Sequence, residues 1–198
     1  MVDKYIKSNM CMLPWSGIET RPSGRYKPCC IYREDLTDSE GKHYNTTEHS
    51  ITEVMNSEAM VKLRNEFLAG EKPAGCISCW KEESAGKTSK RQHTWYKAPE
   101  LGQVYINKNI VSPGFVDLKL GNICNLKCRI CAPNSSSIWA NEMAKFDPTR
   151  KKYWTKFNKD GMWPKQKNKF FEDIEKHIES IKFFEITGGE PLMINKTW

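Results

Sequence analysis

The sequence predicts an α/β fold with two parts: a small cysteine-rich α+β domain over residues 1–110 and the start of a parallel β/α array over residues 111–198. The cysteines fall into two groups, over 11–79 and 124–131. A stretch with prolines and glycines at 99–114 separates them, which places a domain boundary near residue 110. The second part then alternates strand, helix and strand with a long crossover, the order of a parallel βαβ unit.

The first part is predicted to combine short strands with two helical segments. Residues 12–32 contain repeated glycine and proline, which is typical of short strands and turns. Ser50-Ile-Thr-Glu53 has the form of a capping box. Apolar residues then recur at helical spacing up to a glycine stop (Met60, Leu63, Phe67 and Gly70), so we expect a helix that ends near Ala69. A second short helix or turn is expected over 76–85.

The second part is predicted to contain two strands and two helices. Residues 115–120 and 181–186 are apolar enough to form strands. A helix is expected from about Ser135 to Lys145. Another is expected where apolar residues recur at 3.6 spacing (Phe170, Phe171, Ile174 and Ile178).

The formal charge of +7 is concentrated in residues 145–169, which hold nine basic and two acidic side chains. The rest of the chain is neutral on balance, which argues against a general nucleic-acid-binding surface. Aromatic residues interleave with these cations (Tyr153, Trp154, Phe157 and Trp163), a mixture that could bind a nucleic acid or an acidic peptide. We favour a solvated crossover loop whose aromatic residues pack on the preceding helix. The histidines show no metal spacing and are expected at the surface (His43, His49, His93 and His177).

Two patterns bear on the compartment. No apolar run approaches the roughly 18 residues that a membrane helix needs, and the N-terminus lacks the apolar core of a secretory signal. The cysteines lie close together, with Cys29 and Cys30 adjacent and Cys76 and Cys79 three apart. Such spacing without a secretory signal indicates metal ligation in a reducing compartment, so we expect a cytoplasmic protein.

The strongest motif is Cys124-Asn-Leu-Lys-Cys128-Arg-Ile-Cys131, directly after a predicted strand. Three thiolates in one loop can bind three irons of a four-iron cluster and leave the fourth iron without a protein ligand. An iron with an open position is a site for chemistry. The alternatives are a zinc loop or a cluster used only for electron transfer, but no cysteine or histidine follows within forty residues to complete a zinc site.

This loop, followed by Gly188-Gly189-Glu190-Pro191 after the second strand, resembles a radical S-adenosylmethionine (SAM) enzyme. The resemblance implies that Cys124, Cys128 and Cys131 hold a SAM-binding 4Fe-4S cluster and that Gly188, Gly189 and Glu190 bind SAM. It also implies reductive cleavage of SAM to a 5′-deoxyadenosyl radical, with flavodoxin or ferredoxin as reductant. The family usually has an aromatic residue at the position of Ile130, near the adenine, and isoleucine retains only an apolar contact. No side chain is assigned as a catalytic residue.

The first cysteine group resembles the twitch domain, a shortened SPASM domain that carries an auxiliary cluster in radical SAM maturases. The resemblance implies a second, auxiliary 4Fe-4S cluster held by Cys11, Cys29, Cys76 and Cys79, and a peptide or protein substrate. Cys30 could replace Cys29 as the ligand. A structural four-cysteine zinc site is the alternative.

A complete radical SAM core is a partial barrel of about six β/α units, and only its first two strands fit after residue 111. We therefore expect a fragment or half of a split enzyme, with a second chain completing the barrel across an open apolar strand edge. The alternative is a non-catalytic iron–sulfur or zinc protein that transfers electrons or binds a partner.

Overall fold

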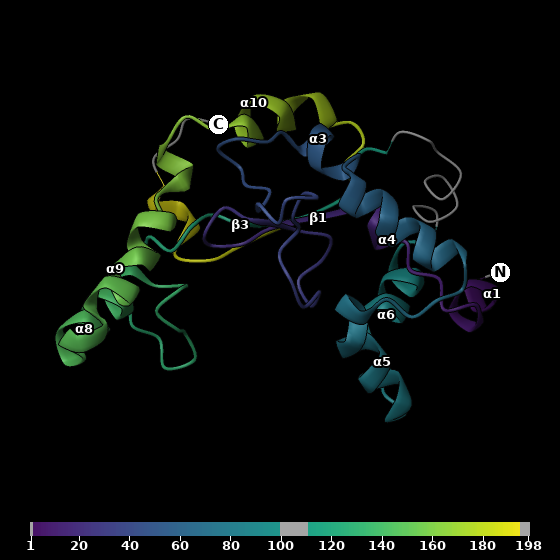
Figure 1. The fold of residues 1–198 in the computed structure, drawn as a ribbon, viewed down its shortest axis with the longest axis horizontal. Coiled ribbons are helices and arrows are strands. Elements are labelled where there is room, and N and C mark those ends of the chain that lie inside the picture. Colours follow the sequence, from purple (N-terminus) through teal and green to yellow (C-terminus); the bar gives the residue numbers. More distant parts are fainter. Residues whose placement is uncertain (1, 100–110, 195–198) are drawn as a thin grey trace.

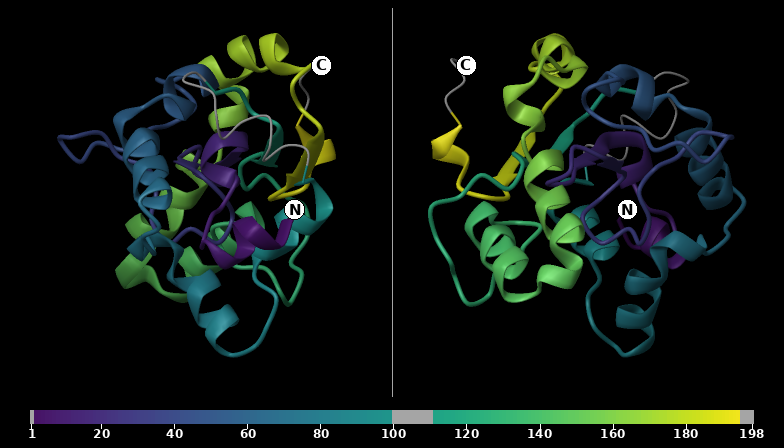
Figure 2. Two further views of the ribbon diagram at one scale, coloured as in Figure 1. Left: turned by 90° about the vertical axis from the view of Figure 1, so that its right-hand side faces the viewer. Right: turned by 60° about the vertical axis from the view of Figure 1, so that its left-hand side comes forward.

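The computed structural model describes residues 2–99 and 111–194 (Figures 1 and 2). The helices of the first part are α1 (Val2–Lys7), α2 (Leu13–Ser16), α3 (Ile51–Met55), α4 (Glu58–Leu68), α5 (Ile77–Ser84) and α6 (Lys90–Lys97). Those of the second part are α8 (Ser137–Phe146), α9 (Lys151–Asp160) and α10 (Lys169–Ile174). Short 3-10 turns lie at Ala74–Cys76, Pro148–Arg150, Trp163–Lys165, Glu175–His177 and Pro191–Met193. The strands are β1 (Gly17–Thr20), β2 (Tyr26–Lys27), β3 (Phe115–Lys119) and β4 (Phe183–Thr187).

The strands form one open sheet in the order β2-β1-β3-β4. β3 pairs in parallel with β4, and the register places Phe115 opposite Phe183. This confirms the predicted parallel βαβ unit. β1 also pairs in parallel with β3, with Gly17 opposite Phe115, while β2 runs antiparallel at the edge. The protein is therefore a mixed α/β fold with a small open sheet, and the predicted start of a barrel stays a prediction.

The sheet takes strands from both sides of the boundary predicted near residue 110. β1 belongs to the N-terminal part and lies directly beside β3 of the C-terminal part. A single cluster of buried apolar residues likewise joins Trp15 and Ile18 to Val116 and Leu118. The predicted linker falls on residues 100–110, outside the described residues. β3 is a central strand, and its two neighbours satisfy the backbone N–H and C=O groups along both of its edges.

The helix expected to end near Ala69 is divided into α3 and α4. Ser50 and Glu53 form the predicted capping box at the start of α3. Asn56 then donates its side-chain amide to the carbonyl of Thr52, and Ser57 adopts an extended backbone and caps α4. A second N-cap residue inside an apolar repeat therefore restarts the helix, because Ser57 satisfies the free N–H groups of the next turn.

The crossover over residues 145–169 is mostly helical, which corrects the prediction of a loop. α9 packs against α8, and Asn158 donates to Asn141 at 2.6 Å between the two helices. Tyr153 packs edge-on against Trp154 and Phe157, with ring centroids 4.9 and 5.1 Å apart. The alternation of cations with aromatic residues in the sequence did not lead us to predict that α9 is an amphipathic helix.

Trp163 packs in the core with two aromatic residues at the start of α10. Its ring stacks on Phe171 at 5.7 Å and meets Phe170 edge-on at 5.9 Å. The prediction that the aromatic residues of this segment pack on the preceding helix is therefore wrong for Trp163, because its neighbours come from the helix that follows.

His177 is buried, contrary to the expectation that the histidines lie at the surface. Its Nε2 lies 2.9 Å from the hydroxyl of Thr52 and 3.3 Å from a carboxylate oxygen of Asp173. The same oxygen of Asp173 accepts from the backbone N–H of Thr52 at 2.9 Å and from its hydroxyl at 2.8 Å. These bonds attach α3 to α10, so a polar cluster as well as the apolar core joins the two parts of the chain.

Figure 1 shows how the sheet separates two groups of helices. α1, α4, α5 and α6 lie at one end of the strands, and α8 and α9 lie at the other end. α3 and α10 lie side by side above the strands in the view of Figure 1. Among the described residues, no helix has both the length and the apolar character needed to cross a membrane.

Candidate iron-sulfur centres

The two cysteine groups lie at opposite ends of the sheet. The loop with Cys124 follows the carboxyl end of β3, where parallel sheets usually place their chemistry. Cys11 precedes α2 and β1, and Cys29 follows β2, which runs back along β1 towards its amino end. The five residues of β3 span about 16 Å, so the two cysteine groups are separated by a distance of at least that order. In Figure 1 the two regions lie on the left and the right of the strands.

The three cysteines of the loop are close neighbours. Cys124 is buried, whereas Cys128 and Cys131 are exposed. The backbone N–H of Cys131 donates to the carbonyl of Cys128 at 3.0 Å, which curls the loop. Partial loss of hydration raises the pKa of the exposed Cys131 thiol, and the nearby sulfurs of Cys128 and Cys124 raise it further. The thiols of Cys124 and Cys128 thus lie near that of Cys131, and those of Cys128 and Cys131 are open to solvent.

The start of α8 holds this loop in shape. The hydroxyl of Ser136 donates to the carbonyl of Leu126 at 2.8 Å. The hydroxyl of Ser137 accepts from the N–H of Cys124 at 3.2 Å and donates to its carbonyl at 3.1 Å. The indole of Trp139 donates to the carbonyl of Cys128 at 3.0 Å. These three residues were not predicted; the serine run before the helix was the signal for Ser136 and Ser137.

Gly188 and Gly189 lie against the backbone of the cysteine loop. Both have left-handed backbones, with φ of 80° and 56°. A Cβ on Gly189 would lie 2.5 Å from the carbonyl oxygen of Ile123, so only glycine fits there. The N–H of Glu190 donates to that carbonyl at 2.7 Å. The structure therefore brings the glycine motif and the start of the cysteine loop into direct contact.

The remaining two predicted SAM-binding residues make few contacts. One carboxylate oxygen of Glu190 accepts from the N–H of Leu192 at 3.2 Å and caps the 3-10 turn that follows. Its other oxygen remains available as an acceptor for an ammonium group. Ile130 is 98% exposed at the tip of the loop. Its predicted contact with adenine stays a prediction.

In the N-terminal part, one small cavity is lined by all four predicted auxiliary ligands: Cys11, Cys29, Cys76 and Cys79. Cys30 lies on a neighbouring cavity with Lys90, Phe115 and Asp117. Cys29 lines both cavities, whereas Cys30 lines only the second one. The geometry thus favours Cys29 over Cys30 as the fourth ligand.

The four-cysteine cavity has the features of an iron–sulfur site. Burial raises the pKa of all four thiols, that of Cys29 to about 12, and repulsion between neighbouring thiolates adds to the shift at Cys11, Cys29 and Cys76. Backbone N–H groups of Leu13, Ile31 and Arg91 donate to the thiols of Cys11, Cys29 and Cys79. Hydrogen bonds of this kind tune the sulfurs of a bound cluster.

Two cations also line the cavity and suit an anionic thiolate cluster. Lys90 lies over the ring of Phe115, 4.7 Å from its centroid. Arg91 is 2% exposed and binds Glu83 through a 2.7 Å ion pair. Arg91 also donates to the carbonyl of Met10 at 2.9 Å. The donor set, burial and charge therefore fit a four-iron cluster, and they also fit zinc, which accepts four thiolates.

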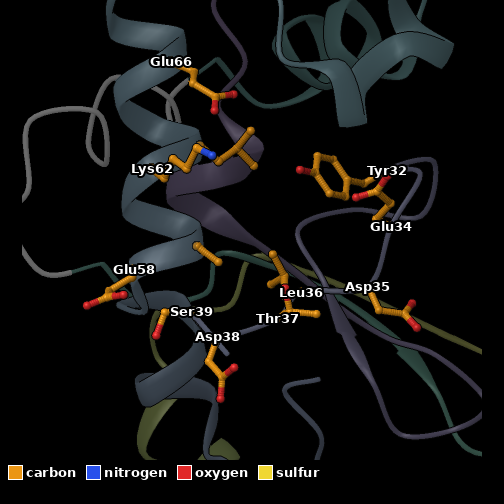
Figure 3. A pocket seen from close by; sticks show the side chains of 12 residues that line it. Tyr32, Glu34, Asp35, Leu36, Thr37, Asp38, Ser39, Glu58, Lys62 and Glu66 are labelled. Atoms are coloured by element: carbon orange, nitrogen blue, oxygen red, sulfur yellow. The ribbon is translucent and has the colours of Figure 1, made fainter. Parts of the chain in front are cut away.

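An acidic pocket adjoins this cavity. Tyr32 lines both, and burial raises the pKa of its hydroxyl to about 12. Figure 3 shows Tyr32 and Glu34 on one side of the pocket and Glu58, Lys62 and Glu66 of α4 on the other. The acidic pocket and the N-terminal cysteine cavity are thus neighbours that share Tyr32.

The ligand assignments themselves stay predictions. Within residues 2–99 and 111–194, no group of three or more His, Cys, Asp or Glu side chains stands ready to hold a metal ion. All eight cysteines are free thiols, with no disulfide between them.

Comparison with protein families supports the N-terminal site. Residues 11–80, about a third of the chain, match the model of the SPASM family, an iron-sulfur cluster-binding domain. The matched segment contains all four cysteines of the cavity. SPASM domains are typically associated with radical SAM enzymes. The predicted SPASM-like iron–sulfur domain is therefore confirmed, while the loop at 124–131 lies outside the match. No curated protein and no solved structure gave a match.

Proposed function

We propose that this chain belongs to a radical SAM enzyme with an N-terminal auxiliary iron–sulfur domain. The observation that carries the proposal is the contact between Gly189 and the cysteine loop at the carboxyl end of β3. Cysteine loop and glycine motif are far apart in sequence, yet they form one edge of a site. The SPASM match in the same chain supports the class of enzyme.

A 4Fe-4S cluster with SAM supplies reductive cleavage of SAM and hydrogen abstraction by the resulting 5′-deoxyadenosyl radical. Cys124, Cys128 and Cys131 would hold that cluster, with the loop oriented by Ser137 and Trp139 of α8. Backbone carbonyls beside Gly188 and Gly189 and the free oxygen of Glu190 would accept the ammonium group of SAM.

The second cluster would be held by Cys11, Cys29, Cys76 and Cys79. Four thiolates leave its irons without an open position, and the site lies at the end of the sheet opposite the cysteine loop. These features favour electron relay or structural support over direct contact with substrate. We further propose that the reductant is a flavodoxin or ferredoxin, that the substrate is a peptide or protein, and that the protein is cytoplasmic. Eight free thiols suit a reducing compartment.

The outer edge of β4 is proposed to accept a further strand, from this protein or from a second chain, that continues the barrel. In the described part of the chain, β4 pairs only with β3. Phe184 and Ile186 are 43% and 45% exposed on this strand. Open apolar edges pair readily with other strands. We expect the isolated chain to self-associate in sedimentation velocity and Ile186→Lys to reduce that association without changing iron content. A monodisperse wild-type monomer would contradict this part of the proposal.

The test of function begins with anaerobic reconstitution with iron and sulfide. We expect about eight irons per chain, as two four-iron clusters require. Electron paramagnetic resonance of the reduced protein should show one signal that changes on addition of SAM. Cys128→Ala should abolish the SAM-sensitive signal and keep the other, and Cys76→Ala should do the reverse.

Two outcomes would contradict the proposal. Zinc in place of iron at both sites would indicate a structural metal protein. Loaded clusters that do not respond to SAM would indicate an iron–sulfur protein that transfers electrons or binds a partner.

A further inference from the structure

A second pocket, which no cysteine lines, lies where the N-terminal part meets α9. Its walls come from the turn after β1, the loop at 42–47, the last turn of α9 and the 3-10 turn that follows. These segments are brought together only by the fold. The pocket is close to the carboxyl end of β1, on the side of the sheet where ligands commonly bind.

Cations dominate the walls of the pocket. Arg25, Lys42, Lys156 and Lys159 line it, with Asp160 as the one carboxylate among its lining residues. Asp160 is engaged by Lys156 through a 2.5 Å ion pair. Two of the other cations form ion pairs with carboxylates that do not line the pocket: Arg25 with Asp35 at 3.1 Å and Lys42 with Glu48 at 2.6 Å.

Lys159 is the cation of this pocket for which the described residues provide no ion pair. It lies in the last turn of α9 and is exposed. The lining therefore has an excess of positive charge, which favours an anionic ligand.

Polar atoms without partners lie in the floor of the same pocket. Thr46 is fully buried and Trp163 is 2% exposed, yet neither Oγ1 of Thr46 nor Nε1 of Trp163 has a hydrogen-bond partner. Nδ1 of His43 is also buried without a partner. Buried polar groups in folded proteins are nearly always satisfied, so three orphans around one pocket indicate a missing ligand. A hydroxyl and an indole N–H are both donors, and an anion supplies acceptors.

Gly24 shapes this floor. Its backbone is left-handed, with φ of 79°, and a Cβ at this position would lie 2.7 Å from Oγ1 of Thr46. Glycine thus lets the turn after β1 approach Thr46 and Trp163 closely.

We propose that this pocket binds a phosphate group carried by a small molecule. A phosphate has several acceptor oxygens and more than one negative charge, which matches buried donors beneath a ring of cations. The site uses neither cysteine group, so the proposal does not depend on the proposed radical SAM function.

The test uses the whole chain, purified anaerobically, and inorganic phosphate as the probe. Binding is measured by calorimetry and by the phosphate-dependent rise in unfolding midpoint, against sodium chloride at equal ionic strength. Thr46→Val and Lys159→Gln should each weaken phosphate binding about tenfold, since each removes one charged or charge-assisted hydrogen bond. Lys152→Gln is the matched control, because Lys152 is exposed on α9 and outside the pocket.

Thr46→Val has a second expected signature. The hydroxyl it removes has no partner in the protein, so the variant should unfold at the wild-type midpoint or above it without phosphate. If that variant fails to fold, Lys159→Gln and its control still decide the question.

Two results would overturn the proposal. One is the absence of any effect of phosphate beyond that of chloride. The other is an equal loss in Lys152→Gln and Lys159→Gln, together with tighter binding of a single-stranded oligonucleotide than of phosphate. That pattern would assign the cations of α9 to a nucleic-acid surface instead of a phosphate pocket.

Discussion

Asp173 offers a quantitative test of how the two parts of the chain are held together. Burial alone would raise its pKa, but hydrogen bonds from the backbone and hydroxyl of Thr52, with Lys176 and His177, lower the pKa to about 2. The ordinary value is 3.8. The difference corresponds to about 2 kcal/mol of stability, because each pKa unit is worth about 1.4 kcal/mol. We therefore expect Asp173→Asn to lower the free energy of unfolding by about 2 kcal/mol at pH 7.

The pH dependence follows from the direction of the shift. The folded pKa lies below the unfolded one, so the unfolded chain binds the proton more readily. The contribution of Asp173 is complete above about pH 5 and is lost as the pH falls through 4 towards 2. Urea unfolding of wild type and Asp173→Asn at pH 7, 5, 4 and 3 should show a difference that narrows at the acidic end.

Glu172→Gln provides the control for this experiment. It removes the same charge from the neighbouring position of α10, where the carboxylate is exposed and pairs with Lys167 only at 3.9 Å. Exposed pairs of this kind contribute little, so we expect a change within about 0.5 kcal/mol. An Asp173→Asn variant as stable as Glu172→Gln at pH 7 would refute the reasoning. A difference that stays constant from pH 7 to pH 3 would refute it as well.

Three further predictions concern the cysteine sites. Cys29→Ser should lose the auxiliary cluster while Cys30→Ser keeps it, as judged by iron content, because only Cys29 lines the four-cysteine cavity; equal losses would contradict the assignment. Gly189→Ala should have a free energy of unfolding in urea at least 1 kcal/mol lower than that of Gly41→Ala. Both backbones are left-handed, but only at Gly189 would the added Cβ lie 2.5 Å from a carbonyl oxygen; equal stabilities would argue against that contact. Trp139→Phe should speed loss of the cluster from the 124–131 loop to a chelator at least several-fold, because it removes the indole donor that holds the loop; an unchanged rate would show that the bond is dispensable.

Local chemistry made several elements predictable. The capping residues Ser50 and Glu53 act within one turn of helix, and the apolar runs that form β3 and β4 are visible without knowledge of their neighbours. The four cysteines that line the N-terminal cavity were also named beforehand, through the resemblance of their pattern to the twitch form of the SPASM domain. The match of residues 11–80 to an iron–sulfur domain agrees with that prediction.

Pairings between distant segments were not predictable. Nothing near residues 17–20 indicates that they lie beside β3, because parallel strands are joined through long connections whose ends meet only in the folded chain. The contact of His177 with Thr52 was not predictable either, because Thr52 lies in a helix far away in the sequence. Nor was the contact of Lys156 and Lys159, within the basic segment 145–169, with a pocket of the N-terminal part.

The sequence by itself determined the ligand chemistry of the chain: which thiols are available, and that glycines stand where a loop must approach a backbone closely. Only the tertiary structure decided that Cys29 and not Cys30 lines the four-cysteine cavity, since the elements packed around the pair leave only Cys29 on that cavity. The tertiary structure also placed Gly189 against Ile123 and gathered the orphaned donors of Thr46 and Trp163 beneath Lys159. The physical reason is that the bonds a side chain can form depend on the residue itself, whereas the distance between residues remote in sequence depends on how the whole core packs.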